Sequence, residues 1–198
     1  MIDYLEFIDR QIVLFVNGLH FPFLDHFMWV VSGKLTWIPL YVLILILAYK
    51  KLGVKTFGVF VALLLIAIGL SDFISSQILK EYVARYRPSH NLLLRDQLHF
   101  YENKPGEFYR GGQYGFVSSH AANFFAIATF VLLTLKMYTP WFTKWLLPIA
   151  ILVAFSRVYL GVHYLSDVFV GGLIGGLISY FLYRYVYLKM VEKGFVRG

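Results

Sequence analysis

Five long apolar runs constrain the fold of this chain more than any other feature of its sequence. They cover roughly residues 35–50, 54–79, 116–137, 141–160 and 165–189. A helix needs roughly 20 residues to cross the hydrocarbon core, and Lys34 and Lys50 can extend from the ends of the first, shorter run. Hydrophobic residues make up 59% of the chain, charged residues 15%, and the mean hydropathy is +0.67. The sequence therefore predicts an all-α polytopic membrane helix bundle with five spans.

The N-terminal segment differs from these runs. Residues 3–32 are apolar in part, but Pro22 and the charges of Asp9, Arg10 and Asp25 interrupt them. We interpret residues 1–34 as an interfacial segment of amphipathic or broken helices, with a sixth span as the alternative. Its acidic start argues against a secretory signal peptide, which would begin with basic residues.

Charged residues divide unequally between the two ends of the predicted spans. One end carries nine basic residues and the single acid Glu192, and the rest of the chain holds nine basic and ten acidic residues. The basic residues of the first end are Lys50, Lys51, Lys55, Lys136, Lys144, Arg184, Lys189, Lys193 and Arg197. The positive-inside rule places this end in the cytoplasm and the loop 80–115 outside, in the periplasm of a bacterium or in a lumen of a eukaryote. The net charge of +7 thus reflects membrane topology and does not indicate nucleic-acid binding.

The outward ends of the last four predicted spans carry polar residues that a lipid-facing helix would lack. They come from three segments, KEYVARYRP, FVSSHAAN and SRVYLGVHYLSD. The candidate site residues are Lys80, Arg87, Ser118, Ser119, His120, Arg157, His163 and Asp167.

The cations of this set favour a phosphate ligand. Arginine forks bind phosphate oxygens in pairs, and Lys80 adds a point charge. The start of the span at 116–137 offers free backbone N–H groups and the positive end of a helix dipole, and Ser118 adds a hydroxyl. Such a clamp would stabilise the charge of a phosphoryl group in transfer.

The two histidines suit the two sides of an in-line displacement. His163 and Asp167 are four residues apart and share a helix face, so the carboxylate can hold one ring N–H and leave the other nitrogen as nucleophile. His120 comes from another span and can protonate the leaving oxygen and later deprotonate water. We expect no metal and no cofactor, because the basic side chains supply the positive charge. The absence of cysteine excludes thiol nucleophiles.

The pattern Lys80-x6-Arg87-Pro88, Ser118-x-His120 and Ser156-Arg157-x5-His163-x3-Asp167 resembles the signature of the type 2 phosphatidic acid phosphatases, which are related to vanadium haloperoxidases. The resemblance covers about residues 54–189 and implies a catalytic core there, within one domain of residues 1–198. It implies that His163 is phosphorylated, that Asp167 is its partner, that His120 is the acid and base, and that the remaining polar residues hold the phosphate.

The middle motif departs from the family pattern. The family usually has Pro-Ser-Gly-His where this chain has Val117-Ser118-Ser119-His120. Ser119 keeps its backbone N–H, and the valine lacks the preorganisation of proline at a helix start. Neither change removes a chemical group.

These observations predict an enzyme that dephosphorylates a membrane lipid at the outer face of a bacterial inner membrane. Undecaprenyl pyrophosphate is the substrate we favour from the family, and lipid A phosphate, phosphatidylglycerol phosphate and phosphatidic acid remain open. A lipid-phosphate binding protein or a phosphotransferase is the alternative. We infer no obligate protein partner. Two further features stay outside the catalytic set: Asp72 is expected to bond to a neighbouring span, and residues 100–116 form an aromatic cap or a wall against the headgroup.

Overall fold

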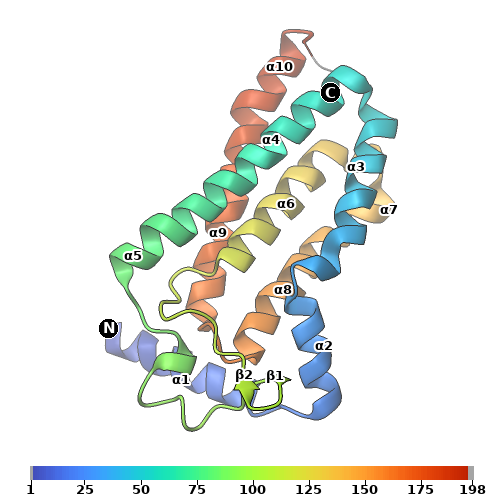
Figure 1. The fold of residues 1–198 in the computed structure, drawn as a ribbon. Helices are drawn as coiled ribbons and strands as arrows, with labels where there is room; N and C mark the ends of the chain where they lie inside the picture. The colour runs from blue at the N-terminus through green and yellow to red at the C-terminus, as the bar shows by residue number, and fades with distance from the viewer. Residues whose placement is uncertain (1, 196–198) are drawn as a thin grey trace.

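The computed structural model describes residues 2–195. Met1 and residues 196–198, which include Arg197 of the basic end, lie outside the described residues. The chain forms a bundle of helices with a small hairpin at one end (Figure 1). The helices are α1 (Ile2–Asn17), α2 (Pro22–Ser32), η1 (Leu35–Trp37), α3 (Ile38–Leu52), α4 (Val54–Asp72), η2 (Phe73–Leu79), α5 (Lys80–Val83), η3 (Pro88–His90), α6 (Ser119–Leu135), α7 (Pro140–Thr143), α8 (Leu146–Tyr159), α9 (Leu165–Leu182), η4 (Tyr183–Tyr187) and α10 (Leu188–Glu192). The strands β1 (Glu102–Lys104) and β2 (Glu107–Phe108) pair antiparallel.

The predicted membrane helix bundle is confirmed. Four helical stretches are long and apolar enough to cross a membrane, and each corresponds to one of the predicted spans. They are Leu35–Leu52, Val54–Val83, Pro140–Tyr159 and Leu165–Glu192. The remaining prediction, 116–137, corresponds to the apolar helix α6, which has 17 residues because it begins only after the cap at Ser118. Helix α6 packs against α4, α8 and α9, so it forms the centre of the bundle.

Two glycines bring α6 and α9 unusually close together. A Cβ atom added at Gly175 would lie 1.9 Å from the carbonyl oxygen of Ala122, and one added at Gly171 would lie 2.6 Å from that of Ser118. The two glycines are four residues apart and lie on one face of α9, as in membrane helix pairs with small residues at the contact. This contact fixes the start of α6 beside the start of α9, where the Ser118 N–H donates to the carbonyl oxygen of Asp167 at 3.0 Å.

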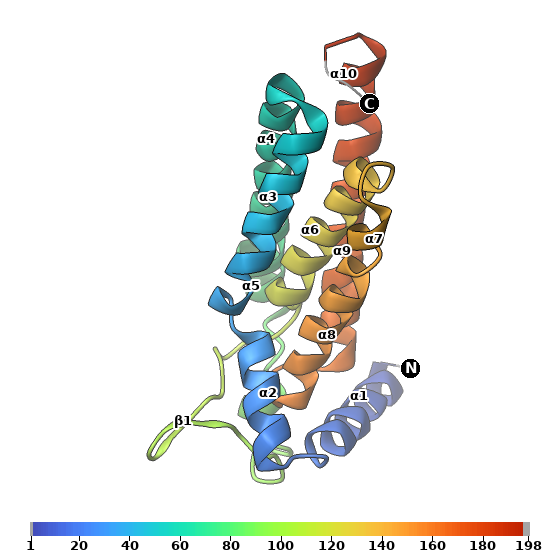
Figure 2. The ribbon, with the colours of Figure 1, turned by 90° about the vertical axis from the view of Figure 1, so that its right-hand side faces the viewer.

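The N-terminal helices occupy the same end of the bundle as the hairpin. Helix α1 lies across this end, and α2 leads from it toward α3 (Figures 1 and 2). Helix α1 buries Val13 and Val16 in contact with the bundle and exposes Phe7 and Phe15. With 16 and 11 residues, α1 and α2 are each shorter than the roughly 20 residues of a span. Their amphipathic character agrees with the interfacial segment that the sequence predicts.

The long polar segment after α5 is folded. The backbone around Tyr86 forms an antiparallel bridge with the backbone around Tyr114. The Arg87 N–H donates to the carbonyl oxygen of Gln113 at 3.0 Å, and the Gly115 N–H donates to that of Arg85 at 2.9 Å. In extended backbone, residues two apart point to the same side. Arg85 and Arg87 therefore face the bundle together, whereas Tyr86 is half exposed.

Candidate active site

A cavity of about 730 Å³ lies at the junction of α3, α4, α6 and the folded loop. Its polar end is lined by six of the eight residues that the sequence identifies, and these are Lys80, Arg87, Ser119, His120, Arg157 and His163. Its other end is lined by apolar side chains of α3, α4 and α6, among them Ile44, Leu65 and Phe124. The cavity thus joins a cationic end to an apolar one. Ser118 and Asp167, the other two predicted residues, lie behind this lining.

His163 and Asp167 form the predicted pair at the polar end of the cavity. His163 Nδ1 lies 3.3 Å from Asp167 Oδ2, and His163 Nε2 lies 3.0 Å from Arg87 Nη1. A guanidinium can only donate and an ionised carboxylate can only accept. Nδ1 therefore carries the proton, and Nε2 directs its lone pair toward Arg87. Burial, followed by the positive charges of Arg87 and Arg157, lowers the pKa of His163 well below its ordinary value, so the ring is neutral at pH 7.

Arg87 is held rigidly beside this lone pair. Its Nε donates to the carbonyl oxygen of Tyr114 at 2.9 Å, and its Nη1 also donates to that of Val162 at 3.2 Å. Burial and the charge of Arg157 lower the pKa of Arg87 to about 10, which leaves the guanidinium charged at neutral pH. A fixed charged fork beside an imidazole lone pair is suited to receive phosphate oxygens.

Arg157 makes contacts that the sequence did not indicate. Its Nη2 donates to the Tyr109 hydroxyl at 2.7 Å, and its Nη1 donates to Ser32 Oγ of α2. Within residues 2–195 its buried Nε has no hydrogen-bond partner. Tyr109 belongs to the segment 100–116 that the sequence describes as an aromatic cap or headgroup wall, and it lines the cavity. No pattern in the sequence singles out Ser32.

Lys80 is positioned through a π-helical segment. The segment η2 follows Asp72 and directs Ser76 and Lys80 toward α6, where Lys80 Nζ donates to Ser119 Oγ at 2.6 Å and Ser76 Oγ lies 2.9 Å from the same atom. Such π-helical turns are frequent at functional sites. Asp72 accepts a hydrogen bond from Asn123 of α6 at 3.1 Å, which confirms the expected bond to a neighbouring span.

The start of α6 supplies the middle motif. Ser118 is fully buried as the N-cap of α6, and its hydroxyl accepts from the Ala121 N–H at 3.4 Å. This hydroxyl therefore serves the helix rather than the cavity. Ser119 and His120 follow in the first turn of α6 and line the cavity, whereas His163 comes from the short segment between α8 and α9.

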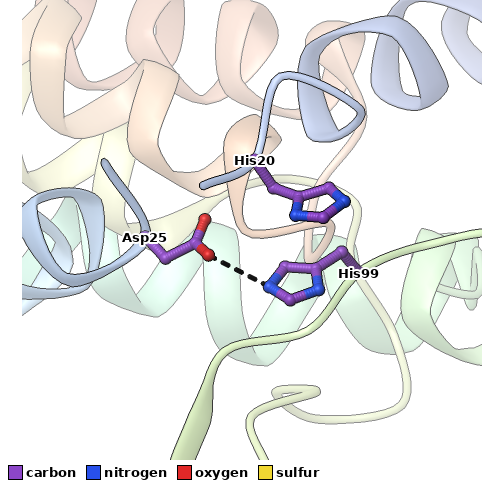
Figure 3. Close-up of side chains that lie close together, drawn as sticks. All are labelled: His20, Asp25 and His99. Atoms are coloured by element: carbon purple, nitrogen blue, oxygen red, sulfur yellow. Dashed lines mark hydrogen bonds and ion pairs between the residues drawn. The ribbon is translucent and has the colours of Figure 1, made fainter. Parts of the chain in front are cut away.

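A second polar cluster joins the N-terminal helices to the folded loop (Figure 3). His99 Nε2 lies 3.1 Å from Asp25 Oδ2, and His20 stacks on His99 with ring centroids 4.0 Å apart and planes 9° apart. The three side chains each offer a ligand atom within 4.8 Å of the others. A metal ion in the plane of one ring would lie far outside the plane of the other, so this arrangement is a stacked, hydrogen-bonded joint. His99 therefore has fixed partners although it lies in the loop.

The joint is anchored from both sides. Asn17, the last residue of α1, donates to the carbonyl oxygens of His99 and Tyr159 at 2.8 Å each and accepts from the His99 N–H at 2.8 Å. The Tyr159 hydroxyl donates to the other oxygen of Asp25 at 2.6 Å. These bonds hold the folded loop, and with it Tyr109, over the cavity.

A cavity that places a neutral, carboxylate-held histidine among fixed cations, at the end of an apolar helix bundle, defines an integral membrane enzyme that acts on phosphorylated lipids. Residues 60–190 match the family model of the PAP2 superfamily, and the chain belongs to this family. The protein is a lipid phosphatase.

Relatives named lipid A 4'-phosphatase match almost the whole chain. The protein of that name from Porphyromonas gingivalis is 32% identical over 94% of this chain and 77% of its own length, and that from Bacteroides thetaiotaomicron is 34% identical over 92% and 79%. An undecaprenyl-diphosphatase from Sulfolobus acidocaldarius is 30% identical over 90% and 75%. The crystal structure of a transmembrane PAP2-type phosphatidylglycerolphosphate phosphatase from Bacillus subtilis covers 98% of this chain and 89% of that one, with a TM-score of 0.68 and 22% identity, and shares its fold.

Proposed function

We propose that the protein removes a phosphate group from a membrane lipid through a phosphohistidine at His163. The observation that carries this proposal is the lone pair of His163 Nε2, which faces the cavity 3.0 Å from Arg87 Nη1. An incoming phosphate oxygen would accept the Arg87 hydrogen bond in place of the imidazole. Nε2 would then no longer be hydrogen-bonded to Arg87, and its lone pair could form a bond to the phosphorus atom.

The reaction proceeds in two displacements. In the first, a bond forms between Nε2 and phosphorus while the bond from phosphorus to the lipid oxygen breaks, and His120 gives that oxygen a proton. In the second, His120 takes a proton from water, the hydroxide forms a bond to phosphorus while the bond between phosphorus and Nε2 breaks, and inorganic phosphate leaves. Arg87, Arg157 and Lys80 stabilise the charge on the equatorial oxygens in both steps. The N–H groups at the start of α6, including that of Ser119, add to this stabilisation.

For the substrate we favour a phosphorylated glycolipid of the lipid A class. The two relatives of that name cover more than 90% of this chain at higher identity than the undecaprenyl-diphosphatase does. This reverses the order that we favour from the family resemblance, which put undecaprenyl pyrophosphate first. Undecaprenyl pyrophosphate remains the second candidate, because Lys34 lines the same cavity and offers a further cation to a second phosphate.

We place the reaction at the periplasmic face of a bacterial inner membrane. The α3–α4 turn, the α6–α7 turn and α10 lie at the end of the bundle opposite the folded loop (Figures 1 and 2). That end carries the cluster of basic residues, which supports a cytoplasmic assignment by the positive-inside rule. The catalytic unit is the single bundle that residues 54–189 form together with the N-terminal segment.

A phosphate-release assay on purified protein tests this proposal. The substrates are lipid A with both phosphates, undecaprenyl pyrophosphate, phosphatidylglycerol phosphate and phosphatidic acid, each in mixed micelles containing a chelator. We expect fastest release from lipid A, and formation of an acid-labile phosphoenzyme that His163→Ala lacks. Full activity of His163→Ala would refute the mechanism, and fastest release from another lipid would refute the substrate.

A further inference from the structure

An ion-pair network behind the cavity links the N-terminal helix to the pair His163–Asp167. Arg85 Nη1 donates to Asp167 Oδ1 at 3.0 Å, and Arg85 Nη2 donates to Asp9 Oδ2 of α1 at 2.9 Å. Asp9 also accepts from the Ser166 N–H at 3.1 Å and from the Ser166 hydroxyl. Asp9 and Asp167 are buried, and the Arg85 side chain is only 17% exposed. Asp9 lies outside the matched residues 60–190, and Arg85 lies within them but is absent from the sequence signature.

The two oxygens of Asp167 have separate partners. Oδ2 faces His163 Nδ1 and accepts from the Tyr164 N–H at 3.0 Å, whereas Oδ1 accepts from Arg85. Arg85 does not line the cavity, so it cannot serve as a phosphate ligand in this arrangement. Its guanidinium stacks 4.0 Å above the Tyr164 ring, which fixes its plane. Arg85 therefore acts on the reaction only through Asp167.

The charges of this network explain why a second carboxylate is present. Arg85 alone would neutralise Asp167 and weaken its attraction for the positive imidazole ring that forms when Nε2 bonds to phosphorus. With Asp9 included, two carboxylates share one guanidinium, and one negative charge remains to balance that ring. Burial by itself lowers the pKa of Arg85, but the charges of Asp167 and Asp9 outweigh burial and raise it, so Arg85 stays protonated.

We infer that Asp9 and Arg85 position the His163–Asp167 pair, and that helix α1 thereby contributes to the active site. Arg85 orients the Asp167 carboxylate, and Asp9 prevents Arg85 from neutralising the negative charge of Asp167. This inference rests on the proposed function, in which His163 is the nucleophile.

Kinetics of Asp9→Asn, Arg85→Gln and the double variant test the inference, using the panel lipid that the wild type hydrolyses fastest. Outer partners of a reacting group typically change activity by about 10–100-fold. We expect Asp9→Asn to lower kcat by about tenfold with KM changed less than about twofold, since the contact affects charge in the transition state only. The double variant should be no slower than Arg85→Gln, because residues that act as one unit are not additive. Arg85→Gln should also move the acid limb of the pH profile of kcat/KM to higher pH, because it removes a cation near His163.

Controls separate this role from folding and from the proposed function. Glu6→Gln lies one turn before Asp9 on α1, breaks the partly exposed Glu6–Arg10 pair and should keep wild-type kcat. Asp9→Glu, which restores the carboxylate, should recover most of the loss. Wild-type kcat in Asp9→Asn, additive losses in the double variant, or an unmoved acid limb in Arg85→Gln would each overturn the inference. If His163→Ala is inactive in the same assay, any of these results refutes this inference alone; if His163→Ala is active, the proposed function fails first.

Discussion

The motif-bearing core and the N-terminal segment contribute to one site in different ways. The core supplies the signature residues that face the cavity, and the contact between α6 and α9 holds them at a fixed spacing. The N-terminal segment supplies partners for two of the core's arginines: Asp9 of α1 holds Arg85, and Ser32 of α2 holds Arg157. In the proposed mechanism, the core therefore supplies the reacting groups and the N-terminal segment positions its cations.

The largest expected effect concerns a cation of the core. Arg87→Lys keeps the charge but loses the planar fork that reaches Tyr114, Val162 and His163 together. We expect kcat/KM to fall about 10²–10³-fold, as for a lost transition-state donor. Phosphate release measures this loss, and a loss below about threefold would show that any positive charge suffices at this position.

The next effect tests the helix contact that spaces the core. Gly175→Ala places a Cβ atom 1.9 Å from the Ala122 carbonyl oxygen, so α6 and α9 must separate. Overpacking of this kind typically costs about 1–3 kcal/mol or more, and a lower melting temperature in detergent should report it together with lost activity. Gly58→Ala on α4 meets no atom within 4 Å and serves as the matched control. Equal stability of the two variants would contradict the role assigned to this contact.

A smaller effect is expected where the N-terminal segment contacts Arg157. Ser32→Ala removes an acceptor from this buried arginine. A hydrogen bond from a charged guanidinium to a neutral hydroxyl contributes about 1.5 kcal/mol or more, so kcat/KM should fall roughly tenfold. Ser179→Ala loses an equally buried bond to the Ala126 carbonyl, far along α9 from the site, and should leave activity unchanged. If Ser32→Ala and Ser179→Ala change kcat/KM to the same extent, α2 does not help to position Arg157.

The smallest effect is a pH dependence of stability in the core. The pKa of His163 is lowered in the folded protein, so below the ordinary value of about 6.5 the unfolded chain binds a proton that the folded chain does not. Stability is then complete above that pH and falls by up to about 1.4 kcal/mol per unit below it. At pH 5.5 the wild type should lose about 2–4 °C more in melting temperature than His163→Gln. Parallel pH curves for the two proteins would show that His163 takes up its proton without unfolding.

Much of the site could be predicted because its chemistry is encoded in spacing. The separation of four residues predicts that His163 and Asp167 lie close together, and they do. They do not share the predicted helix face, because His163 precedes Tyr164, the N-cap of α9. The apolar runs predict the positions of the main helices of the bundle. The role of Arg85 could not be predicted from sequence, because the signature includes Arg87 but not Arg85, and both arginines lie on the same side of one extended segment. The packing of α1 against the start of α9 brings two carboxylates to Arg85, and Arg87 lines the cavity instead. For Ser118 the motif position predicted a phosphate ligand, but its hydroxyl accepts a hydrogen bond from the Ala121 N–H as the cap of α6.

The apolar half of the cavity has a consequence for how the enzyme meets its substrate. Because side chains of α3 and α4 form that half, the lipid chain need not leave a hydrocarbon environment while its headgroup reacts. The enzyme and its lipid substrate then find each other by diffusion within the plane of the membrane. The rate of hydrolysis therefore depends on the mole fraction of substrate in the membrane rather than on its bulk concentration. Adding neutral lipid at constant total substrate should slow the enzyme, and a short soluble phosphate ester should remain a poor substrate at any concentration.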